Sequence, residues 1–355
     1  MTWICWRAIE LSARTQQALL AMEFVTLVVF AVVALVTVYV NHPAHSVEVS
    51  ASWFDPTSIG FTPLTNGVLL AVFIYWGWDT CVTVNEETED AGRAPGRAAV
   101  VSTLMLLAIY LVVTVAAQSY GGPGLLSAHA DDIFSGGLGS SVLGSGLDKL
   151  LIIAVLSSAS ASTQTTILPT ARTTFAMARA KAFPCRFGRI HQRFQTPDFN
   201  TIVMGIVSIA WFVAIVNVSS NVLGDSITAI GFAIAFYYGI TGFACVVYFR
   251  HELFQSVRNF IYIGVLPFAG GAMLTYIFVE AIIFDGNPAN DYSTPILGIG
   301  TPVFIGVGSL VLGVVVMLIA RPFYREFFAR KLEVADPAVL TDDYVHPALR
   351  DGTGL

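Results

Sequence analysis

Residues 67–84 read GVLLAVFIYWGWDTCVTV, and this stretch decides the fold. Its apolar first part, 67–76, would span about 15 Å as a helix, half of the hydrocarbon core of a bilayer. Gly77 and Asp79 follow at that depth, where an ionisable side chain costs at least about 2.5 kcal/mol on insertion scales and rarely faces lipid. Because Gly weakens a helix and Asp or Thr can cap a new one, the pattern predicts a helix interrupted at mid-membrane. Transporters place substrate sites at such interruptions. The alternative is an unbroken helix in which Asp79 is hydrogen-bonded to a neighbour.

The composition of the whole chain indicates a membrane protein. Of its 355 residues, 55% are hydrophobic and 12% are charged, whereas a soluble domain carries about 25% charged residues. There is too little polar surface for a soluble globule of this size. Crossing a bilayer takes about 20 apolar residues of helix. The stretches that qualify are 18–40, 66–85, 98–118, 149–171, 201–218, 226–249, 260–284 and 301–320. The fold class predicted is an all-α polytopic membrane protein with eight transmembrane helices.

The basic residues orient these spans. Of the 18 Lys and Arg residues, all except Lys149 fall in alternate connecting segments or in the two ends of the chain. The loops on the other side, 41–65, 219–225 and 285–300, contain none. By the positive-inside rule the basic side is cytoplasmic, which places both termini in the cytoplasm and the spans in the cell membrane.

Three regions follow from this map. They are a cytoplasmic lead at 1–17, a transmembrane domain at 18–320 and a cytoplasmic tail at 321–355. The lead is expected to be a loop, and the polar residues 335–355 are expected to be disordered. The Gly-rich loop 119–148 is expected on the outer side, with room for one short helix.

The fourth stretch, 149–171, is rich in hydroxyl groups. Its polar residues are Ser157, Ser158, Ser160, Ser162, Thr163, Gln164, Thr165 and Thr166. This density suggests a helix that faces a polar cavity, with an ion site as one interpretation. The alternative is structural, since Ser and Thr hydroxyls often bond to carbonyls of their own helix. Glu23 and Glu280 are further ionisable candidates near span ends, where pairing or snorkelling is the simpler interpretation.

An acidic cluster, EETED at 86–90, follows the interrupted span. Carboxylates beside membrane helices can bind magnesium and a diphosphate, which would make the protein an intramembrane magnesium-dependent enzyme. Such enzymes resemble one another in having two acidic clusters, and this chain has one. A solvated loop in which Arg93 and Arg97 partner the acids is the favoured interpretation.

At this point the residues resemble the amino acid–polyamine–organocation (APC) superfamily of permeases. FIYWGWD at 73–79, NEETED at 85–90 and Pro95 look like the sixth helix of that family and the loop after it. The eighth helix and its loop are matched by TTILPTAR at 165–172, MAR at 177–179, FP at 183–184 and RIHQRFQTP at 189–197. RAIELSAR at 7–14 looks like the entry to the fifth helix. The resemblance covers the chain except its tail.

The resemblance implies helices 5–12 of the leucine-transporter-like inverted-repeat fold. Such permeases have twelve spans, so the first four would be absent here, including the first helix, whose Gly-rich break holds the substrate carboxylate. The substrate's amine and side chain would contact residues of the interrupted span. These substrate candidates, with Asp79 at the interruption, are Phe73, Tyr75, Trp76, Gly77, Trp78 and Asp79. The ion or coupling candidates are Glu23, where some proton-coupled members place a lysine, and Ser158, Ser162 and Thr163 on the family's ion-site helix.

The function predicted is therefore ion-coupled secondary transport of an amino acid or related amine by alternating access. The coupling ion is H⁺ or Na⁺, and no cofactor, metal site, nucleic-acid partner or enzymatic activity is expected. The four cysteines share no close spacing, so they indicate neither a disulfide framework nor a zinc site. The partners are a small-molecule substrate and the lipid bilayer, and the oligomeric state is open. The alternatives are a non-transporting fragment of such a permease and the magnesium-dependent enzyme that uses 86–90.

Overall fold

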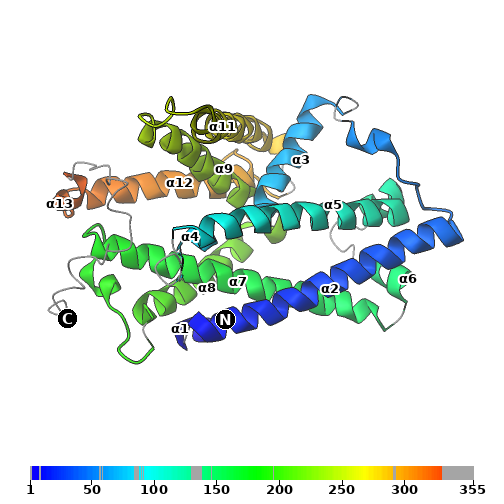
Figure 1. The fold of residues 1–355 in the computed structure, drawn as a ribbon, viewed down its shortest axis with the longest axis horizontal. Helices are drawn as coiled ribbons and strands as arrows, with labels where there is room; N and C mark the ends of the chain where they lie inside the picture. Colours follow the sequence, from blue (N-terminus) through cyan, green and yellow to red (C-terminus); the bar gives the residue numbers. More distant parts are fainter. Residues whose placement is uncertain are drawn as a thin grey trace.

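A computed structural model describes residues 2–7, 9–55, 57, 59–83, 88, 90, 92–128, 138–144, 146–194, 196–290 and 293–329. The regular elements in these ranges are helices (Figure 1). The longer ones are α2 (Ile9–Asn41), α3 (Phe61–Ile74), α5 (Ala94–Ala128), α7 (Asp148–Arg179), α8 (Asp198–Val218), α9 (Val222–Tyr248), α11 (Leu266–Asp285) and α12 (Thr301–Ala320). The short ones are α1 (Thr2–Arg7), α4 (Thr80–Thr83), α6 (Gly139–Leu143), α10 (Val257–Asn259) and α13 (Arg325–Phe328). The π-helix Phe260–Val265 leads into α11, and the 3₁₀ turns are Ala51–Phe54, Cys185–Gly188 and Pro288–Asn290.

The membrane class predicted from composition is confirmed. In the part of the chain that the structure describes, 7 helices are long and apolar enough to cross a membrane. Seven of the eight predicted spans correspond to them. The predicted span 66–85 is the exception, because it is divided between α3 and α4 and neither piece is long enough alone.

The prediction of a loop at 1–17 is wrong. Residues 2–7 form α1, and α2 already begins at Ile9. The reason lies in the sequence of α2, which contains neither Gly nor Pro and so has nothing to stop the helix before the apolar span begins. Helix α1 packs against α2, α7 and α8, with Cys5 buried. The predicted disorder at 335–355 lies outside the described residues.

The long helices pack as two groups, each around its own apolar cluster. The first cluster joins α2, α5, α6 and α7 through residues such as Phe30, Ala116 and Leu151. The second joins α3, α9, α11 and α12 through residues such as Phe232 and Ile277. Helix α4 continues the chain from α3 but packs against α5 and α7 of the first group. The interrupted span thus passes from one group to the other.

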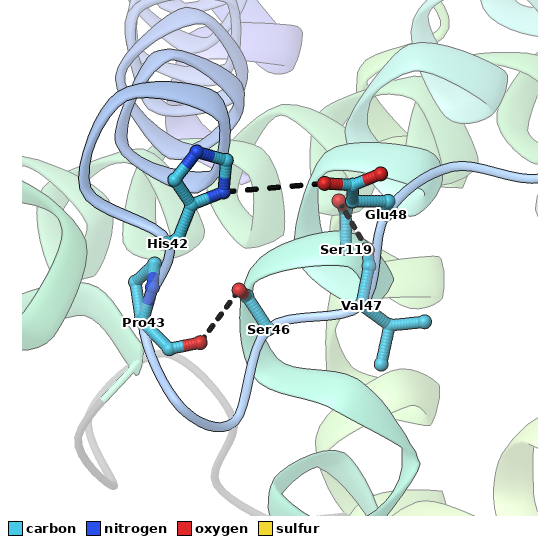
Figure 2. Close-up of polar contacts among 6 residues, drawn as sticks. All are labelled: His42, Pro43, Ser46, Val47, Glu48 and Ser119. Carbon is cyan, nitrogen blue, oxygen red and sulfur yellow. Dashed lines mark hydrogen bonds and ion pairs between the residues drawn. The ribbon is translucent and has the colours of Figure 1, made fainter.

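The C-terminal part of α5 is held by the loop that follows α2 (Figure 2). The Val47 N–H donates to the Ser119 carbonyl over 2.8 Å, and Ser119 Oγ donates to the Val47 carbonyl over 2.7 Å. Just beyond, Gly122 has φ of 63°, and a Cβ there would lie 2.7 Å from the His45 carbonyl oxygen. Only Gly fits, so α5 bends under this loop and continues to Ala128. The outer loop is therefore shorter than predicted, and α6 supplies its short helix.

Candidate functional site

The predicted span 66–85 is interrupted where the sequence pattern predicts. Helix α3 ends at Ile74, residues 75–79 form turns, and α4 starts at Thr80. The Trp76 N–H donates to the Phe73 carbonyl over 3.1 Å, and this bond closes a tighter turn than the turns of an α-helix. Gly77 then has φ of 112°, a left-handed backbone that side chains with a Cβ rarely adopt. The alternative of an unbroken helix is excluded by this geometry.

Two tyrosines of α9 hold the interruption in place. Tyr238 Oη donates to Asp79 Oδ1 over 2.8 Å, and Tyr237 Oη donates to Asp79 Oδ2 over 3.2 Å. The same hydroxyls accept hydrogen bonds, Tyr237 from Trp76 Nε1 over 2.7 Å and Tyr238 from the Gly77 N–H over 3.3 Å. We call Tyr237 and Tyr238 the tyrosine pair. The pair satisfies both the Asp79 carboxylate and a backbone N–H that the interruption releases.

The predicted aromatic residues surround this network, and two of them stay accessible. Trp76 and Trp78 are 37% and 38% exposed although each contacts a tyrosine of the pair. The Tyr75 ring packs edge-on against Tyr110 of α5, with 5.6 Å between ring centroids. Phe73 is partly buried in the last turn of α3. The interruption therefore offers indole faces beside a carboxylate.

The coupling candidates are brought together only in part. Glu23 of α2 and Ser158 of α7 lie near one another, so these two predicted residues are brought together. Ser162 and Thr163 lie on the exposed side of α7, and Thr163 Oγ1 donates to the Ala159 carbonyl of its own helix over 2.8 Å. Several neighbouring hydroxyls of α7 bond in the same way. These bonds to their own helix are the contacts that the structure shows for these hydroxyls, and the ion-site interpretation stays a prediction.

Tyr110 links the coupling candidates to the interruption. Its hydroxyl donates to the Ile74 carbonyl, at the end of α3, over 3.0 Å. The same tyrosine interacts electrostatically with Glu23. Sequence reasoning missed Tyr110 and the tyrosine pair. The sequence FYYG at 236–239 carried the signal, because paired hydroxyls in an apolar span need hydrogen-bond partners inside the protein.

A cavity of about 230 Å³ lies between α3, the start of α9, the end of α11 and the start of α12. Its lining includes Asp225, which is 2% exposed. The hydroxyls of Ser219 and Ser293 each donate to Asp225 Oδ2 over 2.6 Å. No residue of 73–79 lines this cavity. The hydrogen-bonded interruption, and not this cavity, is the candidate site.

The predicted magnesium cluster at 86–90 is largely untested by the structure. Glu86, Glu87 and Glu89 lie outside the described residues, and Asp90 accepts only backbone bonds among the interactions that the structure shows, from the N–H groups of Arg93 and Ala94. These bonds close the turn that starts α5.

Fold and site together define a polytopic helical membrane protein with one span interrupted part-way, a design that membrane transporters use. A protein-family model described as amino acid permease matches residues 1–307, and the chain belongs to that family. It is similar to uncharacterized transporters of Mycobacterium bovis and Mycobacterium tuberculosis, at 30% identity over 177 residues. That match covers 48% of this chain and 37% of each relative, so the matched part is little more than a third of their length. The resemblance to APC permeases is thereby confirmed. The absence of the family's first four helices stays a prediction.

Proposed function

We propose that the protein moves an amino acid or a related amine across the cell membrane by alternating access, driven by a proton or sodium gradient. Both termini lie in the cytoplasm in this proposal, as the positive-inside rule indicates. The observation that carries it is the interruption at 75–79, where exposed Trp76 and Trp78 flank a carboxylate held by the tyrosine pair.

The chemistry of the interruption suits an ammonium group. A carboxylate has about four acceptor positions, and the tyrosine pair uses two of those on Asp79. The exposed indoles of Trp76 and Trp78 can bind a cation over their faces, which contributes about 0.5–2 kcal/mol depending on desolvation. A positively charged amine therefore finds acceptors and aromatic faces together.

Coupling would use the groups beside the interruption. Glu23 can exchange a proton, and it lies near Ser158 where α2 packs on α7. The exposed hydroxyls of Ser162 and Thr163 supply the oxygen ligands that sodium would need. Tyr110 donates to the Ile74 carbonyl at the end of α3 and lies near enough to Glu23 to feel its charge, so a change of that charge could reach the site through Tyr110. The ion remains H⁺ or Na⁺ in the proposal.

Uptake by proteoliposomes tests the proposal. Radiolabelled amino acids and amines are supplied under an imposed proton or sodium gradient. Gly77→Leu should abolish uptake, because a Leu cannot adopt φ of 112° without strain. Gly308→Leu is the matched control, since Gly308 lies within continuous α12 and a Cβ there meets nothing within 4 Å. Normal uptake by the Gly77→Leu protein would refute a role for the interruption.

Transport, the activity named for the longer relatives, is attributed to this chain only as part of this proposal, because the match covers 37% of their length. A non-transporting member of the family is the second candidate, and the same assay separates the two. Wild-type protein that folds, resists thermal unfolding and still gives no gradient-dependent uptake of any amino acid or amine would favour that second candidate.

A further inference from the structure

Another cavity lies at the opposite end of the bundle, where α7 and α12 both finish. Its volume is about 490 Å³, within the 300–1,000 Å³ range of small-molecule sites. It is formed by the end of α7, the segment that follows it, and residues 322–326 after α12. The side chains that matter for its chemistry are Lys181, Phe183, Phe323, Tyr324, Arg325 and Glu326. Residues 73–79 do not contribute to it.

The end of α7 presents a lysine to this cavity in an unusual way. The helix closes with two backbone bonds, from the Ala182 N–H to the Met177 carbonyl over 2.8 Å and from the Lys181 N–H to the Ala178 carbonyl over 3.1 Å. This closure places Lys181 in the left-handed region, with φ of 60°, where Gly is the usual residue because a Cβ is strained there. The two backbone bonds of this closure offset part of that strain. Backbone strain of this kind is common at ligand sites.

Lys181 is held in the structure by an ion pair that a stronger anion can replace. Its Nζ lies 2.8 Å from Glu326 Oε2, and the two side chains are 67% and 75% exposed. Exposed pairs of this sort contribute little to stability, because water and salt screen them. Arg325 adds a second cation to the lining, so the two cations outnumber the one carboxylate among its named residues.

The surroundings resemble a membrane interface. Phe323 is 79% exposed and lies in the segment after α12, with Tyr324 beside it in the cavity wall. Aromatic residues concentrate at the level of the lipid headgroups, and basic pockets between helices on the cytoplasmic side bind anionic headgroups. The cavity lies on the side of the predicted spans that carries the basic residues. Its placement in the cytoplasm therefore rests on the topology given under the proposed function.

We propose that this cavity binds the headgroup of an anionic phospholipid. Lys181 and Arg325 contact the phosphate, and Phe323 lies in the interface next to the acyl chains. Glu326 occupies Lys181 when no lipid is bound and competes with the phosphate for it. Because the cavity is walled by α7 of the first helix group and by the segment after α12 of the second, a bound lipid joins the two groups.

The test uses the whole chain, delipidated in a neutral detergent. Phosphatidylglycerol or phosphatidylcholine is titrated in, and bound lipid is counted by native mass spectrometry while thermal unfolding is followed. Phosphatidylglycerol should bind at least about fivefold more tightly and raise Tm. Lys181→Gly should keep its lipid-free Tm or raise it, because Gly relieves the left-handed strain, yet bind phosphatidylglycerol about fivefold more weakly. Glu326→Gln should bind it more tightly, since the competitor is gone.

Arg258→Ala is the matched control, because it removes one exposed cation from the same side of the protein without touching the cavity. Its affinity for phosphatidylglycerol should equal that of the wild type. Equal binding of both lipids, an equal loss in Arg258→Ala and Lys181→Gly, or equal protection by inorganic phosphate at the same concentration would each overturn the proposal. The readout needs no transport, so a failed uptake assay leaves it standing.

Discussion

Replacing Tyr238 with Phe should loosen the interruption while the packing of α9 is kept. The change removes one hydroxyl, which donates to Asp79 Oδ1 over 2.8 Å and accepts from the Gly77 N–H over 3.3 Å. A hydrogen bond to a charged group contributes about 1.5–3 kcal/mol, and a neutral one contributes less. The ring remains to pack against Trp78, 5.2 Å away between centroids. We therefore expect a loss of about 2 kcal/mol in the stability of this conformation, which is a factor of about thirty in its opening equilibrium.

Hydrogen exchange in lipid nanodiscs measures this opening directly. Local opening sets the exchange rate of protected amides, so the hydrogen-bonded amides of Gly77 and Thr80 should exchange about thirtyfold faster in Tyr238→Phe. Tyr248→Phe is the control, because Tyr248 lies on the same helix, is 42% exposed and makes a ring contact with Phe249. Tyr237→Phe should give a smaller effect, since its bond to Asp79 is longer, at 3.2 Å. Unchanged exchange in Tyr238→Phe, or an equal acceleration in Tyr248→Phe, would show that the hydroxyl does not hold the interruption.

Three further substitutions test other parts of the structure, each read by thermal unfolding or hydrogen exchange. Gly122→Ala should lower stability by about 1–3 kcal/mol, because φ is 63° and the new Cβ would lie 2.7 Å from the His45 oxygen; a wild-type Tm would contradict the bend. Ser119→Ala should cost about 1 kcal/mol and speed exchange at 46–48, since one of two bonds to Val47 is lost. Asp225→Ala should cost about 3 kcal/mol, because two serine hydroxyls lose their acceptor; a loss no larger than that in Ser119→Ala would show that the buried carboxylate matters little.

The sequence predicted the features that depend on residues close together in the chain. Apolar length gave the spans, and Gly77 beside Asp79 gave the interruption, since both follow from local backbone and solvation preferences. The partners of Asp79 could not be predicted in this way, because Tyr237 is separated from it by 158 residues. Glu23 and Ser158 were each singled out, but only the packing of α2 on α7 shows that they meet. The loop predicted at 1–17 is wrong because an uninterrupted helical sequence and contacts with α7 and α8 keep these residues helical.

The interrupted span has one tether to each group of helices. Tyr110, from the first group, binds the last turn of α3 through the Ile74 carbonyl. The tyrosine pair, from the second group, binds Asp79 and Gly77 at the turn. Since α3 packs in the second group and α4 against the first, a movement of one group relative to the other must be absorbed between residues 75 and 79. A ligand that binds the exposed faces of Trp76 and Trp78 would act at that same place, so occupancy of the site and the relative position of the groups would be coupled through one short turn.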